Sequence, residues 1–402
     1  MFVDTLKHIF GRGSIIGINQ LSVLISLPIL ASRLDLIIFG QIAIGFLMVQ
    51  LSWVVSNWGV EQFSIEEWLK KKTLKQKNNF TSLVVSLNIT ISLLCLFIIF
   101  ILTFFKIIDF SLLFFLSLIP SILMGGTYPL WFFQVQKSPH EMIFPTFASR
   151  LIFLLIIYFF VNGNDSAYLA FVAQGIGLSL ITIFSFYKMV KKYNFIMMKF
   201  SFDELFLISK KSYPYLVNTI TNNKINTLWS FGLSICGGPA AMATYNIGDQ
   251  IYRAGSALTN IIAQSIRIYF MGKPIKDMQS IFIFFVSIFF MITLGVYFLS
   301  EYFVITFFPP NYLSAIPIIK IMIIAWGMHG AIKLLNYPVL GESFGAIWVN
   351  KITYTILIIH FIAFLIWNYF FEGAIMMSII FASVVFSQLI FFIIFTCYAK
   401  KK

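Results

Sequence analysis

The stretch that decides the fold runs from residue 82 to 104 and reads SLVVSLNITISLLCLFIIFILTF, which is 23 residues without a charge. It follows a lysine-rich run, KKKTLKQK, at 70–77. A helix needs about 20 mostly apolar residues to cross the hydrocarbon core of a bilayer. We therefore predict a transmembrane helix over 82–104 whose N-terminal end emerges into a positively charged aqueous link.

The same pattern recurs along the whole chain. Of its 402 residues 59% are hydrophobic and only 11% are charged, and the mean hydropathy is +0.91, which lies outside the soluble globular range. The chain is predicted to be an all-α, polytopic integral membrane protein. We expect twelve spans, at about 14–32, 38–59, 82–104, 110–132, 143–161, 167–187, 213–236, 241–265, 280–300, 314–335, 348–368 and 374–397.

The distribution of positive charge predicts the orientation. The formal net charge is +13, from 28 basic and 15 acidic residues. If the N-terminus is cytoplasmic, 20 of the 28 basic residues fall in cytoplasmic segments and only Arg33 and Lys106 fall in outward links. This bias predicts that both termini are cytoplasmic, and it explains the net charge without a nucleic-acid partner.

A long cytoplasmic link at 188–212 separates six predicted helices from six. We expect an N-terminal six-helix half at 1–200 and a C-terminal six-helix half at 201–402, arranged around a central cavity. Two halves of the same orientation with a site at their interface form a recurrent transporter architecture. We predict that transport proceeds by rocking of these halves, with the link as a tether.

Polar residues form stripes inside two neighbouring predicted spans. In the eighth span polar side chains recur every three or four residues, so they share one helical face. The members of that face are Asn246, Asp249, Arg253, Ser256, Asn260, Gln264 and Arg267. The seventh span carries a similar stripe of Asn218, Asn222 and Asn226, with Lys224 beside it. Because ionisable residues within a membrane are costly, both stripes are predicted to line a water-filled cavity.

Two cations are expected at matched depth in this cavity. Lys224 lies 13 residues before Gly237, and Arg253 lies 14 residues after Pro239. At about 1.5 Å per residue, both lie roughly 20 Å below the turn between the helices. A second interpretation remains open, in which Asp249 and Arg253 neutralise each other at i and i+4 and Lys224 snorkels to the interface.

Two further cations are candidates for substrate binding. Arg150 lies about two turns inside the fifth predicted span. Lys333 lies at the inner end of the tenth span, below His329, and could equally snorkel to the interface. His329 by itself is more often a hydrogen-bonded interior residue than a proton relay.

The residue patterns of enzymes are absent from the sequence. It contains no glycine-rich phosphate loop, no metal-ligand spacing and no acidic cluster that would hold magnesium. Its three cysteines are far apart, and the longest outward link, about 301–313, is too short for an external catalytic lobe. We therefore expect no catalytic residues, no metal, no cofactor and no enzymatic activity.

One short motif resembles a known family. The stretch PLWFFQVQK at 129–137 is similar to the Trp-Phe-Phe-Gln signature of the O-antigen flippases (Wzx) of the multidrug/oligosaccharidyl-lipid/polysaccharide (MOP) exporter superfamily. The opening from Gln20 through Pro28 to Arg33, followed by Phe39-Gly40, also resembles that family, as does Tyr245-Asn246. The chain departs from the pattern at 34–36 and at Val135, where glycines are common.

The resemblance implies a bacterial inner-membrane flippase that moves undecaprenyl-pyrophosphate-linked oligosaccharide units from the cytoplasmic to the periplasmic leaflet. Its partners would be that lipid-linked substrate, the bilayer and other polysaccharide assembly proteins. An anionic, heavily hydroxylated headgroup requires buried cations together with amide and hydroxyl side chains. The predicted stripes contain these residue types.

Three other functions are weighed against this one. A drug or cation antiporter of the same superfamily would favour an acidic cavity, whereas the interior cations here outnumber the interior carboxylates. An integral-membrane polysaccharide polymerase or glycosyltransferase would require an external lobe with carboxylates or arginines. A purely structural scaffold gives no reason for a buried polar stripe.

Overall fold

The computed structural model describes residues 2–223, 225–270, 275–335 and 346–399. Within these ranges the side chains at 2–12, 62, 217–218, 220–223, 264–270, 275–285, 334–335, 346–354 and 395–399 are not described. The described residues form helices and connecting turns only. The chain separates into two compact units, unit 1 at Met1–Thr227 and unit 2 at Leu228–Lys402, which are considered one at a time.

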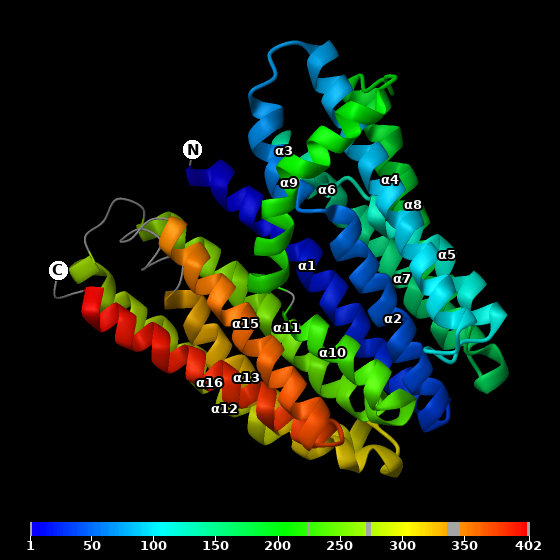
Figure 1. The fold of residues 1–402 in the computed structure, drawn as a ribbon, viewed down its shortest axis with the longest axis vertical. Helices are drawn as coiled ribbons and strands as arrows, with labels where there is room; N and C mark the ends of the chain where they lie inside the picture. Colours follow the sequence, from blue (N-terminus) through cyan, green and yellow to red (C-terminus); the bar gives the residue numbers. More distant parts are fainter. Residues whose placement is uncertain (1, 224, 271–274, 336–345, 400–402) are drawn as a thin grey trace. The chain divides into compact units, whose positions relative to one another are not determined.

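Unit 1 is built from nine α-helices and two short 3₁₀ turns over its described residues (Figure 1). They are α1 (Phe2–Ala31), α2 (Leu36–Asn57), α3 (Val60–Leu69), α4 (Leu74–Phe104), α5 (Leu112–Thr127), α6 (Leu130–Val135), η1 (Pro139–Met142), α7 (Ile143–Phe160), η2 (Asn164–Ser166), α8 (Leu169–Tyr193) and α9 (Phe202–Asn223).

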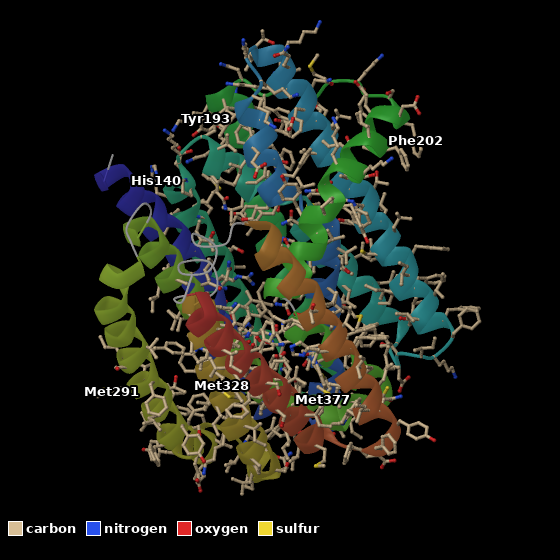
Figure 2. The ribbon with its side chains drawn as sticks, turned by 60° about the vertical axis from the view of Figure 1, so that its left-hand side comes forward. His140, Tyr193, Phe202, Met291, Met328 and Met377 are labelled. Carbon is tan, nitrogen blue, oxygen red and sulfur yellow. The ribbon has the colours of Figure 1, made fainter. Side chains whose placement is uncertain are left out.

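Unit 2 contains most of α10 and the remaining helices. In order they are α10 (Ile225–Cys236), α11 (Gly238–Phe270), α12 (Ile275–Phe307), η3 (Pro310–Ala315), α13 (Ile316–Leu335), α15 (Ala346–Phe370) and α16 (Ala374–Ala399). Methionines on three of them, Met291 on α12, Met328 on α13 and Met377 on α16, are labelled in Figure 2.

Small residues let the helices of unit 1 approach closely, as is common in membranes. A Cβ on Gly126 of α5 would lie 2.1 Å from the Ser92 hydroxyl of α4. On the other side of the unit, a Cβ on Gly177 of α8 would lie 2.8 Å from the Ser149 carbonyl oxygen of α7. Both distances are too short for a side chain, so these two seams require glycine.

The helices of unit 1 meet at one end in an aromatic core that we call the aromatic cap. Its central members are Trp68 of α3, Phe80 of α4, Trp131, Phe132 and Phe133 of α6, and Met189 of α8. Figure 2 shows His140, Tyr193 and Phe202 at the same end of the unit. The lysine-rich run 70–77 borders the cap, and the Lys77 ammonium lies 4.1 Å from the centre of the Trp68 ring.

All twelve predicted spans coincide with a helix or a pair of consecutive helices, so the predicted fold class is confirmed. Within the described residues, nine segments are long and apolar enough to span a membrane, and Ile225–Cys236 and Thr355–Phe370 are shorter apolar helices. The predicted eighth span, α11, is not among them despite its 33 residues. The polar side chains of its stripe lower the mean hydropathy of α11. Such a polar face is expected on a helix that faces a polar interior.

Three boundaries differ from the prediction. The fourth predicted span is broken at Tyr128 and Pro129, so its C-terminal end is the separate helix α6. The short helix α3 was not predicted, because Trp58 and Gly59 have positive φ angles of 44° and 71° and the chain turns there before the helix restarts. Any other residue at Gly59 would strain the backbone at this positive φ angle. Its Cβ would also lie 2.3 Å from the Leu216 amide nitrogen.

The third difference concerns the link between the halves. Helix α9 begins at Phe202 instead of 213, because Ser201 and Glu204 form a capping box. The non-helical part of the link is thus limited to 194–201. The division into halves at 200/201 and the tether role of the link stay predictions.

Candidate functional site

The polar stripe of α11 surrounds a buried ion pair inside unit 2. The Arg253 Nε lies 2.7 Å from Asp249 Oδ2, and the two side chains are 7% and 1% exposed. Ser230 of α10 donates to Asp249 Oδ2 at 3.0 Å and accepts from the Arg253 guanidinium at 3.3 Å. The local neutralisation that the sequence left open as a second interpretation is therefore present in the structure.

Hydrogen bonds extend along this stripe in both directions. Asn246, one turn before Asp249, accepts at its Oδ1 from the Gln250 side-chain amide at 3.2 Å. One turn after Arg253, Ser256 accepts from the Lys333 ammonium of α13 at 3.1 Å. Between them the Tyr252 hydroxyl is hydrogen bonded to His329 Nδ1. Asn260, the next member of the stripe, is partly buried.

Four predicted site residues cannot be placed in this network. Lys224 lies outside the described residues, and the side chains of Asn218, Asn222 and Gln264 also lie outside the described part. The expected pairing of Lys224 with Arg253 at matched depth therefore stays a prediction.

Unit 1 contains a different kind of interior cation. Arg150 of α7 is partly buried, and its Nε donates to the Asn19 Oδ1 of α1 at 2.6 Å. Its guanidinium also lies 5.9 Å from the centre of the Phe153 ring. Among the side chains that the structure describes, no carboxylate lies within 4.0 Å of Arg150. The described polar contact of this interior cation is thus with a neutral amide.

Other polar groups gather near Arg150. The Tyr128 side chain at the end of α5 interacts electrostatically with both Arg150 and Glu61. Gln134 of α6 donates its side-chain amide to Glu61 Oε1 at 3.0 Å, and the backbone N–H of Glu61, in the first turn of α3, donates to Asn57 Oδ1 at 2.9 Å. Five helices of unit 1 thus contribute to one polar region, which we call the Arg150 region.

Neither Glu61 nor Asn19 was among the predicted site residues. The available signal for Glu61 was local, since this carboxylate lies two residues after the Trp58-Gly59 turn. The partners themselves could not be predicted, because Asn19 and Arg150 are 131 residues apart and Glu61 and Gln134 are 73 apart.

The Trp-Phe-Phe-Gln motif has a packing role in this structure. Its three aromatic side chains are at most 4% exposed and lie in the aromatic cap. Edge contacts join Phe80 to Trp131 at 6.3 Å and Tyr193 to Phe132 at 5.5 Å between ring centres. This packing fixes α6, and α6 in turn directs Gln134 towards Glu61.

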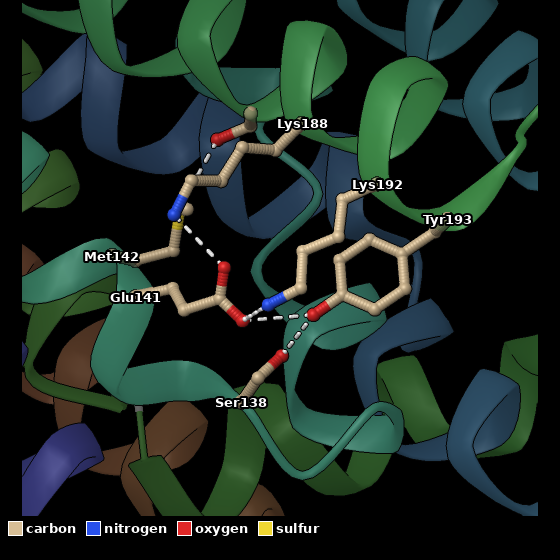
Figure 3. Close-up of polar contacts among 7 residues, drawn as sticks. Ser138, Glu141, Met142, Lys188, Lys192 and Tyr193 are labelled. Atoms are coloured by element: carbon tan, nitrogen blue, oxygen red, sulfur yellow. Dashed lines mark hydrogen bonds and ion pairs between the residues drawn. The ribbon is translucent and has the colours of Figure 1, made fainter.

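A partly buried carboxylate in η1, directly before α7, fastens that turn to the end of α8 (Figure 3). Glu141 Oε2 lies 2.8 Å from the Lys188 ammonium, and Glu141 Oε1 lies 2.8 Å from the Lys192 ammonium. The Tyr193 hydroxyl donates to the same Oε1 at 2.9 Å and is 2.7 Å from the Ser138 hydroxyl. We call this group the Glu141 clamp. It positions α7, the helix that carries Arg150.

Within the described residues, no group of three or more histidine, cysteine, aspartate or glutamate side chains could hold a metal ion. Both ring nitrogens of the buried His360 have hydrogen-bond partners. Its Nδ1 accepts from the Trp229 indole at 3.0 Å, and its Nε2 lies 2.5 Å from the Gln388 side-chain amide. An indole nitrogen can only donate, so His360 is held as a neutral hydrogen-bonded side chain of the interior.

Three solved transporter structures have the same fold over nearly the whole chain. The eukaryotic MATE transporter AtDTX14 is 14% identical with a TM-score of 0.58, covering 100% of this chain and 98% of that one. A multidrug resistance MATE family transporter of the MOP superfamily matches in its inward-facing conformation with 13% identity and a TM-score of 0.57, covering 99% and 96%. Its outward-facing conformation matches with 12% identity and a TM-score of 0.56, covering 98% and 97%.

These likenesses establish a multi-pass membrane protein with the fold of MOP-superfamily transporters. No curated protein matches the sequence significantly. The family described as "Polysaccharide biosynthesis protein" matches residues 6–268, which is more than half of the chain. The chain is therefore a member of the polysaccharide biosynthesis protein family, with a MATE-like transporter fold.

Proposed function

We propose that this protein is a flippase of the bacterial inner membrane. It translocates undecaprenyl-pyrophosphate-linked oligosaccharide units, of O-antigen or a related surface polysaccharide, from the cytoplasmic to the periplasmic leaflet. Membership of a polysaccharide biosynthesis family and the fold of a transporter support this proposal at the level of class. The choice of an anionic substrate rests on the interior of unit 1.

The single observation that carries the proposal is the state of Arg150. Its hydrogen-bond partner among the described side chains is the neutral oxygen of Asn19, and no described carboxylate lies within 4.0 Å of it. A guanidinium presents a planar fork of donors that matches phosphate geometry. The amide and hydroxyl groups around it suit a sugar headgroup, while the isoprenoid tail remains in the bilayer.

A drug or cation antiporter is less well supported by the same interior. Such a protein needs a carboxylate that is available to a cationic ligand. Asp249 is already neutralised by Arg253, and one oxygen of Glu61 accepts from Gln134. A polymerase or glycosyltransferase would require a catalytic lobe, and the predicted outward connection between α12 and α13 consists of Phe308, Pro309 and the six-residue 3₁₀ helix η3.

Arg150→Gln and Arg150→Lys test the proposal in a strain that lacks its own flippase. Loss of one charge-assisted phosphate contact should cost about 1.5–3 kcal/mol, which is roughly a ten- to hundredfold decrease in flipping rate. Lysine keeps the charge but loses the fork, so Arg150→Lys should recover only part of the activity. The readouts are surface polysaccharide, lipid-linked units retained on the cytoplasmic side, and membrane abundance.

Lys320→Gln provides the matched control. Lys320 is also a cation on an apolar helix, α13. Unlike Arg150, it forms an ion pair of 2.6 Å with Glu301 on the surface of unit 2. The control should flip substrate at the wild-type rate. Normal flipping by an Arg150→Gln protein of normal abundance would contradict the proposed role of this residue.

Orientation is tested separately by reporter fusions. The 20 cytoplasmic lysines and arginines predicted by the positive-inside rule place the C-terminus in the cytoplasm. A fusion after Lys402 should be active only with a cytoplasmic reporter. Activity of a periplasmic reporter at that position would rule out the proposed topology.

A further inference from the structure

The link between α8 and α9 is attached to unit 1 at the ends of two apolar segments. The Met198 amide donates to the Ser82 hydroxyl of α4 at 2.9 Å, and Ser82 begins the uncharged run 82–104. Further along, the Trp58 indole donates to the Ser209 carbonyl of α9 at 3.0 Å, and Trp58 directly follows α2. Both α2 and α4 are apolar enough to span a membrane, so each attachment lies where a spanning segment meets the aqueous phase.

The two attachments lie on the same side of the membrane, because only α3 and the run 70–77 separate the end of α2 from the apolar part of α4. We call residues 194–211 the surface segment; it is non-helical to 201 and continues as the first turns of α9. A further hydrogen bond of 3.2 Å, from the Asn78 side-chain amide to the Asn194 carbonyl, holds its start on α4. The surface segment therefore runs along the membrane boundary instead of away from it.

One face of the surface segment is part of the core of unit 1. Phe195, Leu205 and Ile208 are buried and pack in the same cluster as the aromatic cap. Leu205 and Ile208 are three residues apart, so they share one face of α9. This packing fixes which face of the segment points outwards.

The outward face is rich in large apolar side chains. Phe202 (Figure 2) and Phe206 lie one turn apart on α9 and are 79% and 64% exposed. Ile196, Met197 and Leu207 are also more than half exposed. A contiguous apolar surface of this kind is costly in water and marks a site that another apolar phase covers. Aromatic side chains in particular concentrate where a bilayer meets water.

Lysines flank this apolar face. Lys199 and Lys210 are exposed, and neither forms an ion pair with any residue that the structure describes. The acidic residues Asp203 and Glu204 lie in the first turn of α9, where a negative charge stabilises the helix, and Glu204 is engaged in its cap. An apolar face with lysines beside it is typical of a helix that lies on an anionic lipid surface.

We propose that the surface segment binds flat on the cytoplasmic leaflet of the membrane. Phe202 and Phe206 enter the boundary between headgroups and acyl chains, while Lys199 and Lys210 bind the phosphates of anionic lipids. The partner is the bilayer and not a second protein, because both attachments of the segment already lie at the membrane boundary. The link between the two predicted halves is then a strap held on the membrane, where the sequence suggested a tether in water.

The depth of the segment is measured by spin labelling of the full-length protein in nanodiscs of phosphatidylcholine and phosphatidylglycerol. Cys95, Cys236 and Cys397 are first replaced by alanine, so that a label attaches only to an introduced cysteine. A label at Phe206→Cys should be more accessible to oxygen than to a water-soluble nickel complex. Lys72→Cys is the control, because this exposed residue precedes the apolar part of α4, and its label should prefer nickel. A preference for nickel at both positions overturns the proposal.

The charge of the lipid is tested with the double variant Lys199→Gln and Lys210→Gln. Phosphatidylglycerol and phosphatidylcholine are titrated onto the detergent-purified full-length protein, and bound lipids are counted by native mass spectrometry. The wild type should prefer phosphatidylglycerol, and loss of two lysines near the lipid surface should weaken its binding about ten- to thirtyfold.

Lys72→Gln with Lys75→Gln is the matched control, since it removes the same charge from exposed residues on the aqueous side of Ser82. This control should change phosphatidylglycerol binding less than about twofold. An equal loss in both double variants would show that overall charge, and not the surface segment, attracts the lipid. Unchanged binding in the Lys199 and Lys210 variant would show that these lysines bind no lipid. Either result overturns the proposal, and neither measurement depends on the proposed flippase activity.

Discussion

Two interior arginines whose side chains the structure describes, Arg253 and Arg150, have different electrostatic surroundings. In unit 2, Arg253 is 7% exposed and forms a 2.7 Å ion pair with Asp249 on its own helix. In unit 1, Arg150 donates to the neutral Asn19 of another helix at 2.6 Å. Removing one member of a buried ion pair leaves a buried charge uncompensated, whereas we proposed above that a cation with a neutral partner binds a mobile anion. The residue type alone therefore does not identify a binding site.

The largest expected effect comes from breaking the pair in unit 2. Arg253→Gln leaves the buried Asp249 carboxylate without its counter-charge, which should cost about 3–5 kcal/mol and reduce membrane abundance severely. The double variant Asp249→Asn with Arg253→Gln should restore abundance, because neither charge is left unpaired. Quantitative immunoblots of membrane fractions measure both. Equal abundance of the single and double variants would show that the ion pair does not stabilise unit 2.

The flipping activity of the double variant tests whether Arg253 binds substrate in addition to pairing with Asp249. We predict that it stays inactive in the flippase-deficient strain although it accumulates normally, because Arg253 also contributes to substrate binding. Recovery of flipping by the double variant would remove Arg253 from the substrate-binding residues and leave it with a structural role alone. Arg150 would then be the one described interior arginine with a functional role.

An intermediate effect is expected at the Glu141 clamp. Glu141→Gln removes the charge that holds Lys188 and Lys192, at 2.8 Å each, and should lower stability by about 1.5–3 kcal/mol. The loosened start of α7 should also reduce flipping through Arg150. Thermal unfolding of the purified protein measures the first effect. Glu67→Gln is the control, because Glu67 pairs with the well-exposed Lys70 and should matter little. A clamp variant as stable as this control would contradict the positioning role.

A smaller effect is expected at Gln134. Gln134→Ala removes the hydrogen bond of 3.0 Å to Glu61 but leaves the aromatic packing of α6 in place. The loss should be about 0.5–1.5 kcal/mol in the Arg150 region, seen as a reduced flipping rate at nearly normal abundance. Phe133→Ala, by contrast, should reduce abundance first, because that side chain is fully buried. If both variants behave alike, Gln134 serves packing only.

The smallest effect is expected at the surface of unit 2. Lys320 and Glu301 are 29% and 50% exposed, so their ion pair should contribute less than about 1 kcal/mol. Lys320→Gln should change neither abundance nor flipping. A clear loss of flipping with this variant would mean that a general decrease in positive charge, instead of the specific place of Arg150, controls transport.

Much of the fold could be predicted because lipid imposes simple conditions. A spanning segment must be apolar over about 20 residues and must satisfy its backbone hydrogen bonds internally, so hydropathy locates most of the spanning helices. The same reasoning explains why α11 stands out, since only a helix with a protected face tolerates its polar stripe. The pair Asp249–Arg253 was foreseeable as well, because i and i+4 positions are neighbours on any helix.

The sequence by itself determined the class of protein, the positions of the spans and the polar face of α11. Only the tertiary structure decided which cation is neutralised and which is not. Arg150 meets Asn19 across 131 residues, Gln134 meets Glu61 across 73, and Glu141 meets Lys188 across 47. No local pattern encodes such contacts. They follow from how α1, α3, α6, α7 and α8 pack, because a buried charge is set by the side chains that packing places within a few ångströms of it.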